Sequence, residues 1–102
     1  MSLNQFFDKD DDDQYSSIVC EETRRRIRVS VAAYAYEYMG QPTMTDAEFD
    51  DLSKSINLSI STRRPDLDIW FKNNFEPHTG MWIHRHPERN RLRQIANMIL
   101  EN

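Results

Sequence analysis

The sequence predicts an all-α fold, a small four-helix domain built on an antiparallel helical pair. Three observations indicate this fold. Apolar residues recur at helical spacing in four segments. Capping residues, proline or glycine stand at the ends of these segments. An alternating pattern near the start, which suggests a strand, changes parity part-way and therefore does not fit one strand. At 102 residues the chain has room for one domain with a modest core. The expected helices span 16–39, 45–59, 65–75 and 87–101, with a short extended segment near 81–84.

The amino-terminal residues differ from the rest of the chain in composition. The run 8–13 holds five aspartates and one lysine, so it repels itself and has little apolar surface to offset the entropy of ordering. We expect residues 1–14 to form a flexible acidic tail and residues 15–102 to form a single helical domain. The formal net charge of −4 belongs to this tail, because setting the run aside leaves 12 acidic and 12 basic residues.

Cysteine usage and hydropathy limit the compartment. The single cysteine, Cys20, cannot form an internal disulfide, and no stretch has the length and apolarity of a signal peptide or a membrane span. We therefore expect a cytoplasmic protein of a bacterium or of a phage-infected bacterial cell, with no membrane partner.

The first helix needs an argument because valine and isoleucine alternate through 27–31 as they would in a strand. The tyrosines of 34–38 alternate with the opposite parity, so one continuous strand would place the two groups on opposite faces. A helix ending at Gly40 instead gives a single stripe. This predicted stripe consists of Cys20, Ile27, Val31, Tyr34 and Tyr38. Tyr36 lies opposite it, on a second face that a ligand, a partner or the later helices would cover.

The second helix begins with a capping box, in which Thr45 and Glu48 can each accept a hydrogen bond from the other's backbone amide. Its predicted buried stripe is Phe49, Leu52 and Ile56. Asp46 and Asp50 lie one turn apart near its start, where each acidic residue complements the helix dipole by about 0.3–1 kcal/mol. Their mutual repulsion leaves room for a donor-rich ligand or a basic neighbour.

The segment 34–50, YAYEYMGQPTMTDAEFD, resembles part of the small amino-terminal helical domain (domain Ia) of bacterial NAD-dependent DNA ligases. That domain binds the nicotinamide mononucleotide (NMN) part of NAD. In the ligases a tyrosine–histidine pair near the end of the first helix acts with an aspartate, a tyrosine and a second aspartate on the next helix. The resemblance covers about residues 24–58. It implies a nucleotide site formed by Tyr36, Asp46, Phe49 and Asp50.

Two positions of this site depart from the ligase pattern. Glu37 stands in place of the histidine, and Phe49 stands in place of the second tyrosine. The changes remove an imidazole and a hydroxyl, and a glutamate near the nucleotide phosphate would repel it. We therefore expect any affinity for NAD or NMN to be weakened.

The rest of the chain does not resemble the ligase. None of the three lysines lies in a Lys-x-Asp-Gly adenylation motif, and no nucleophile–base pair is visible. The sequence thus predicts a protein with no enzymatic activity and no catalytic residues. We expect a stand-alone, phage-encoded, ligase-related accessory protein that binds a protein partner, linked to DNA metabolism or host takeover. The alternative is a weak NAD- or NMN-binding module; otherwise no cofactor is expected.

The second half supplies the remaining core. Pro65 suits the first turn of a helix. The apolar side of that helix would be Leu67, Trp70, Phe71 and Phe75. The last helix would present Leu92, Ile95, Ala96 and Ile99. We expect Trp82, between the two helices, to fill the centre of the bundle.

Three histidines, with Glu88 nearby, raise the question of a metal site. The candidates are His78, His84 and His86, since imidazoles and a carboxylate could hold zinc or another divalent ion. Their spacing matches no established pattern. We therefore predict no metal site and expect surface, capping or turn-stabilising histidines.

Nucleic-acid binding is a second alternative function. Arginines on the first and last helices would form a phosphate-binding patch if their faces adjoin. The candidates are Arg24, Arg25, Arg28, Arg89 and Arg93. Against this, Glu21 and Glu22 precede Arg25 and Arg26 by four residues, the favourable spacing for ion pairs within the helix.

Overall fold

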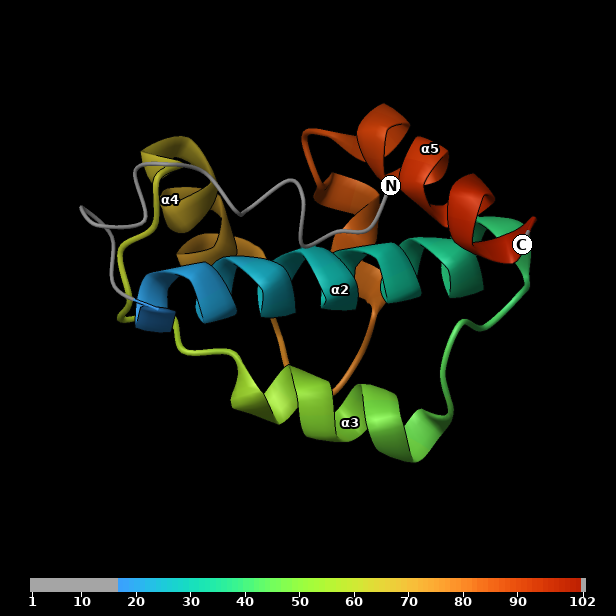
Figure 1. Ribbon diagram of the computed structural model, residues 1–102, viewed down its shortest axis with the longest axis horizontal. Helices are drawn as coiled ribbons and strands as arrows, with labels where there is room; N and C mark the ends of the chain where they lie inside the picture. Colours follow the sequence, from blue (N-terminus) through green and yellow to red (C-terminus); the bar gives the residue numbers. More distant parts are fainter. Residues whose placement is uncertain (1–16, 102) are drawn as a thin grey trace.

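The computed structural model describes residues 17–101, which form four α-helices and one 3-10 helix (Figure 1). The elements are α2 (Ser17–Met39), α3 (Asp46–Ser55), α4 (Pro65–Asn74), η2 (Met81–Arg85) and α5 (Arg89–Leu100). The prediction of an all-α domain is confirmed for this part of the chain. The predicted acidic tail, residues 1–14, lies outside the described residues.

The antiparallel helical pair consists of α2 and α3, which run in opposite directions in Figure 1. Three predicted helices agree with the structure to within two residues at each end, but the predicted helix 45–59 ends four residues early, at Ser55. Ile56 is already extended, with φ −64° and ψ 127°. The chain leaves the helix here because the Asn57 amide donates to the buried Glu22 carboxylate, at 3.0 Å.

The segment predicted to be extended, 81–84, is instead the 3-10 helix η2. The Thr79 hydroxyl accepts a hydrogen bond from the Met81 amide at 3.1 Å, and the Ile83 amide donates to the Gly80 carbonyl at 3.1 Å. This tight turn buries both Trp82 and Ile83, whereas an extended strand would point consecutive side chains to opposite faces.

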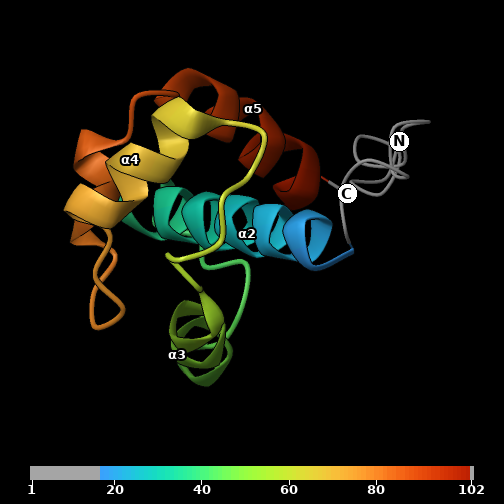
Figure 2. The same cartoon turned by 90° about the vertical axis from the view of Figure 1, so that its left-hand side faces the viewer.

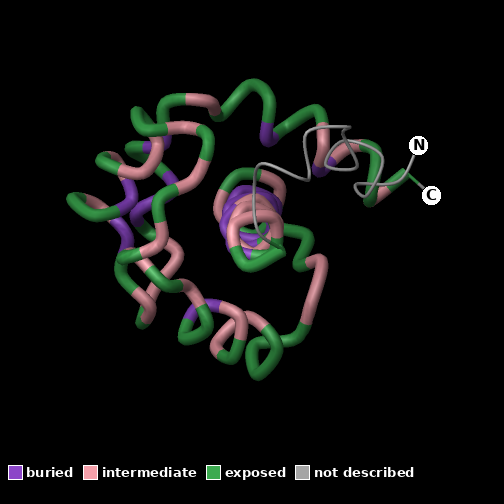
Figure 3. The backbone as a smooth tube through the Cα atoms, turned by 60° about the vertical axis from the view of Figure 1, so that its left-hand side comes forward, coloured by how far each residue is buried: buried purple, intermediate pink, exposed green. Residues whose placement is uncertain are grey.

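Helix α2 lies at the centre of the molecule, with the other elements around it (Figures 2 and 3). The predicted single stripe was therefore too narrow, because every residue from 29 to 35 is buried. Val31 and Tyr34 are buried as predicted, but Cys20 and Ile27 are only half-buried and Tyr38 is exposed. Alanines 32, 33 and 35 leave room for neighbouring elements to approach the α2 backbone on several sides.

An aromatic cluster joins η2 to α4. Trp82 is buried, as predicted, with its ring 6.1 Å from those of Trp70 and Phe71 and 5.1 Å from that of Phe75. Its indole N–H donates to the Thr79 carbonyl at 2.7 Å, so its polar atom is satisfied. On α5, Leu92 and Ala96 are buried, but Ile95 is half-buried and Ile99 is exposed, so the predicted stripe only partly reaches the core.

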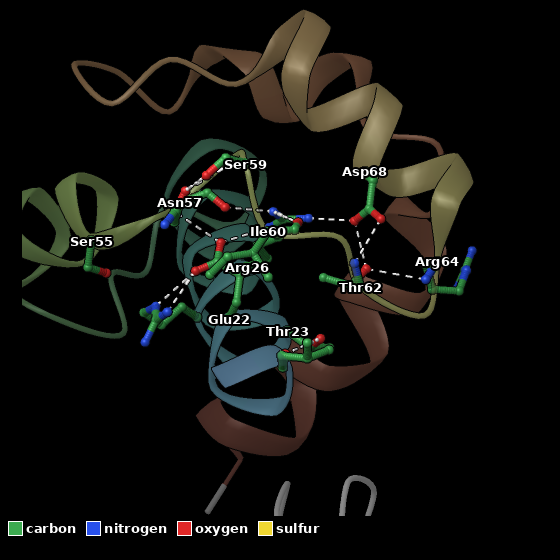
Figure 4. A network of polar contacts seen from close by, with 12 residues as sticks. Glu22, Thr23, Arg26, Ser55, Asn57, Ser59, Ile60, Thr62, Arg64 and Asp68 are labelled. Atoms are coloured by element: carbon green, nitrogen blue, oxygen red, sulfur yellow. Dashed lines mark hydrogen bonds and ion pairs between the residues drawn. The ribbon is translucent and has the colours of Figure 1, made fainter. Parts of the chain in front are cut away.

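A buried ionic network fastens α2 to the loop after α3 and to α4 (Figure 4). The Arg26 guanidinium donates to the carboxylates of Glu22 and Asp68, at 2.8 and 2.6 Å. It also donates to the carbonyls of Asn57 and Ile60, at 2.9 and 3.0 Å. These contacts satisfy the charges of Arg26 and Glu22, which are both buried and would otherwise be costly to bury.

In the described part of the chain, no helix is at once long enough and apolar enough to cross a membrane.

Candidate functional site

A cleft of about 430 Å³ lies between the carboxyl-terminal end of α2, the first turns of α3 and the loop that precedes η2. All four residues predicted to bind a nucleotide line it: Tyr36 from α2, and Asp46, Phe49 and Asp50 from α3. The cleft is open, because Tyr36 is 61% exposed. The second half of the chain therefore borders this face without covering it.

Two local structures set the angle between the helices that form the cleft. Gly40 ends α2 with φ 64°, a left-handed conformation that glycine adopts without steric cost. The predicted capping box then starts α3: the Glu48 amide donates to the Thr45 hydroxyl at 3.1 Å, and the Thr45 amide donates to the Glu48 carboxylate at 2.9 Å. The hydrogen bonds from the Thr45 backbone and hydroxyl also lower the pKa of Glu48.

The loop from Pro77 to Met81 forms the third wall. A Cβ atom added at Gly80 would lie 3.5 Å from the Ala33 Cβ and 3.8 Å from the Phe49 ring, so this loop packs closely against both helices. The loop also contributes His78 to the lining. Sequence reasoning missed this wall, because Gly80 lies 47 positions after Ala33 and 31 positions after Phe49 and meets them only in the folded chain.

The charge of the cleft is negative. Its lining includes the carboxylates of Glu37, Asp46 and Asp50, and no lysine or arginine is among the described residues that line it. Asp50 forms an ion pair with Lys54 at 2.9 Å, but both side chains are about half or more exposed, so solvent weakens the pair. Carboxylates beside the aromatic rings of Tyr36 and Phe49 suit a flat ligand that carries positive charge and N–H donors.

An imidazole lies beside Glu37, although not at the position where the ligases carry one. His84 of η2 places Nε2 2.9 Å from a carboxylate oxygen of Glu37, and Nδ1 2.9 Å from the Tyr38 hydroxyl. Arg89 donates to the same hydroxyl at 3.1 Å and to the His84 carbonyl at 2.8 Å. These contacts hold Glu37 at the edge of the cleft. Sequence spacing could not reveal them, because His84 lies 47 positions after Glu37.

The three candidate metal ligands are in different surroundings. His78 lines the cleft and His84 contacts Glu37, whereas His86 is buried with its ring 4.8 Å from that of Trp70. The His86 Nδ1 accepts a hydrogen bond from the Glu88 amide at 3.0 Å, which is a turn-stabilising contact. Within residues 17–101 no group of three histidine, cysteine or acidic side chains could hold a metal ion.

The candidate arginines for nucleic-acid binding take part in contacts within the chain. Arg25 binds Glu22 at 2.8 Å and approaches Glu21 at 3.8 Å, and Arg89 is held by Tyr38 and His84. Arg28 lies near enough to Glu48 to help lower its pKa. Arg24 is half-buried, and Arg93 is exposed on α5. Phosphate binding through these residues stays a prediction.

Comparisons with protein-family models, with curated proteins and with solved structures find nothing that matches this chain. The resemblance to the ligase domain therefore rests on the residues of the helical pair alone.

Proposed function

We propose that this chain is a non-catalytic binding module whose cleft between α2 and α3 takes the nicotinamide part of NAD or NMN, or a related cationic heterocycle. One observation carries the proposal: Tyr36, Asp46, Phe49 and Asp50 line a single cleft that is open to solvent. That the four residues implied by the resemblance share one cleft supports the proposal.

The chemistry of the lining supports this class of ligand. The nicotinamide ring of NAD and NMN is positively charged, and its amide group carries two N–H donors. Tyr36 offers an exposed aromatic face, and a cation stacked on such a face gains roughly 0.5–2 kcal/mol. The carboxylates of Asp46 and Asp50 can accept the amide donors.

The same lining argues against tight binding of the phosphate. The described residues of the cleft offer it no lysine or arginine, and Glu37 would repel it. We therefore propose that recognition rests on the cationic ring, with a Kd on the order of 1 mM.

We propose that this module belongs to a ligase-related accessory protein. Such a protein would be cytoplasmic, encoded by a bacterium or its phage, and would act on a protein partner in DNA metabolism or host takeover. Ligand binding would be one way for such a protein to sense or compete for nicotinamide nucleotides.

Calorimetry on the full chain tests the proposal with NMN, NAD, 1-methylnicotinamide and nicotinamide. The first three carry the cationic ring and should bind, whereas neutral nicotinamide should bind more weakly. Tyr36→Ala should weaken binding about fivefold, the equivalent of roughly 1 kcal/mol. Asp50→Asn should also weaken it.

The matched control is Asp51→Asn, because Asp51 is an adjacent, exposed carboxylate that does not line the cleft. It should bind as the wild type does. Absence of heat and of thermal stabilisation with all the cationic ligands at millimolar concentration would remove the proposal, as would equal losses in the Asp50 and Asp51 variants.

A further inference from the structure

A second and larger hollow lies on a different side of α2. This groove has a volume of about 630 Å³, and its lining residues come from the amino-terminal half of α2, the segment 62–71 and α5. Its walls are largely apolar, with Val19, Ile27, Leu67, Ile95 and Met98 among them. Met98 is 53% exposed, so an apolar surface stands open here.

The rim of the groove is basic. Arg63 and Arg91 line it and are exposed. Arg64 also lines the groove and forms ion pairs with Asp66 and Glu88, each at 2.9 Å. Among the described lining residues Glu88 is the single carboxylate, so the rim has an excess of positive charge. An occupant of this groove should therefore combine apolar side chains with acidic ones.

The chain itself contains such a segment. Residues 1–16 lie outside the described residues. Their sequence includes the apolar residues Leu3, Phe6 and Phe7, and the aspartate-rich run 8–13 follows directly after Phe7. Burying an aromatic side chain stabilises by about 1.5–3 kcal/mol relative to exposure. Aspartates near exposed arginines add a favourable, salt-dependent attraction.

The point of attachment and the length also fit. The segment joins α2 at Ser17, two residues before Val19, which lines the groove. Nine residues separate Phe7 from Ser17, and the ten Cα–Cα steps between the two can span at most about 33–36 Å. The groove begins beside the point of attachment, at Val19 and Cys20, so its apolar floor is within reach of the phenylalanines.

We propose that the groove between α2, the segment 62–71 and α5 is the docking site for the chain's own residues 1–16. Phe6 and Phe7 enter the apolar floor, and the aspartates lie along the arginine rim. The groove is separate from the nicotinamide cleft, and the proposal does not depend on that function.

Cys20 provides a direct probe, because it is the only cysteine of the chain and it lines the groove. The rate at which the full chain reacts with N-ethylmaleimide, a neutral reagent that the acidic run does not repel, reports how often the groove is open. If the segment is docked about 80% of the time, releasing it speeds the reaction about fivefold. Phe6→Ser with Phe7→Ser should produce this acceleration, and the matched control Asn4→Ser with Gln5→Ser should not.

A variant in the groove tests the other side of the contact. Ile99→Asp places a carboxylate among the lining residues and should accelerate labelling of Cys20, whereas Ile69→Asp alters an exposed isoleucine outside the groove and should leave the rate unchanged. Circular dichroism establishes that each variant is folded. Raising the salt concentration should also accelerate labelling of the wild type.

Equal labelling rates in the wild type and the Phe6/Phe7 variant would overturn the proposal. If the protection of Cys20 against labelling increased with protein concentration, the proposal would also be overturned, because the occupant would then be the amino-terminal segment of a second copy. Protection that is independent of concentration, and that is lost on both the segment variant and the groove variant, supports docking within one molecule.

Discussion

The role of Arg26 is evident only from the fold. In the sequence it belongs to a run of arginines typical of a phosphate-binding surface. In the structure it is 5% exposed and binds the carboxylates of Glu22 and Asp68. Its role is to fasten three parts of the chain together, so it cannot contribute to a basic surface.

Replacing Arg26 by methionine should be severely destabilising. Arg26→Met keeps an unbranched side chain but removes the cation that the carboxylates of Glu22 and Asp68 share in the interior. We expect a loss of about 3–5 kcal/mol in the free energy of unfolding, measured by denaturation with urea. The control, Arg25→Met, removes a half-buried partner of Glu22 and should cost less, about 1 kcal/mol. Similar losses in the two variants would contradict the importance given to the buried network.

At the scale of the element, α3 is the helix most dependent on its own cap. Ser53 is its one buried residue, and the views of Figures 1 and 2 show it lying apart from α4 and α5. Phe49 and Leu52 are only partly buried where they pack against the core, so the capping box at Thr45 supplies a larger share of the stability of this helix. Asp46 and Asp50 of the cleft lie on this helix, so its cap also affects the proposed ligand site.

Removing the cap should loosen α3 without unfolding the rest. Thr45→Ala leaves the Glu48 amide without its acceptor and should cost about 1 kcal/mol. Hydrogen exchange should show faster exchange of α3 amides, with the amides of α2 affected less. Thr45→Ser retains the hydroxyl and should behave nearly as the wild type. If both substitutions had the same effect, the hydrogen bond from the cap would not be the cause.

At the scale of the whole molecule, His86 couples folding to pH. It packs against Trp70 and Phe71, and burial lowers its pKa from 6.5 to about 4. The unfolded chain therefore binds this proton more tightly than the folded chain does. The resulting contribution to stability is complete above pH 6.5 and is lost as the pH falls from 6.5 to 4. Its full size is roughly 3 kcal/mol.

Thermal denaturation between pH 4 and pH 7.5 measures this dependence. His86→Asn can still accept the Glu88 amide but does not titrate, so it should be less stable at pH 7 and have a shallower decline towards pH 4. Asp68 contributes in a separate window. Burial raises the pKa of Asp68, but the hydrogen bonds from Thr62 and Arg26 outweigh burial, so the pKa lies below its usual value of 3.8. The contribution of Asp68 to stability is therefore present above pH 3.8 and is lost as the pH falls below that value. An unchanged slope in the His86 variant would refute this origin of the acid sensitivity.

The sequence by itself predicted the four helices and the residues of α2 and α3 that line the candidate cleft. The signals for these features are local: Gly40, the capping box at Thr45 and Pro65 set boundaries, and Tyr36 and Asp50 are joined by a turn short enough to fix their mutual position. Helix spacing also predicted part of the core, since six residues of the predicted stripes are buried: Val31, Tyr34, Phe71, Phe75, Leu92 and Ala96.

Only the tertiary structure decided that the cleft is open, that α2 is buried on every side through residues 29–35, and that residues 81–85 form a 3-10 helix. It also decided that Arg26 meets Asp68, 42 positions away, and that Glu37 meets His84, 47 positions away. The physical reason is that these contacts join segments far apart in the chain. They are chosen by how the helices pack around α2, and neither the spacing nor the composition of a local segment carries that information.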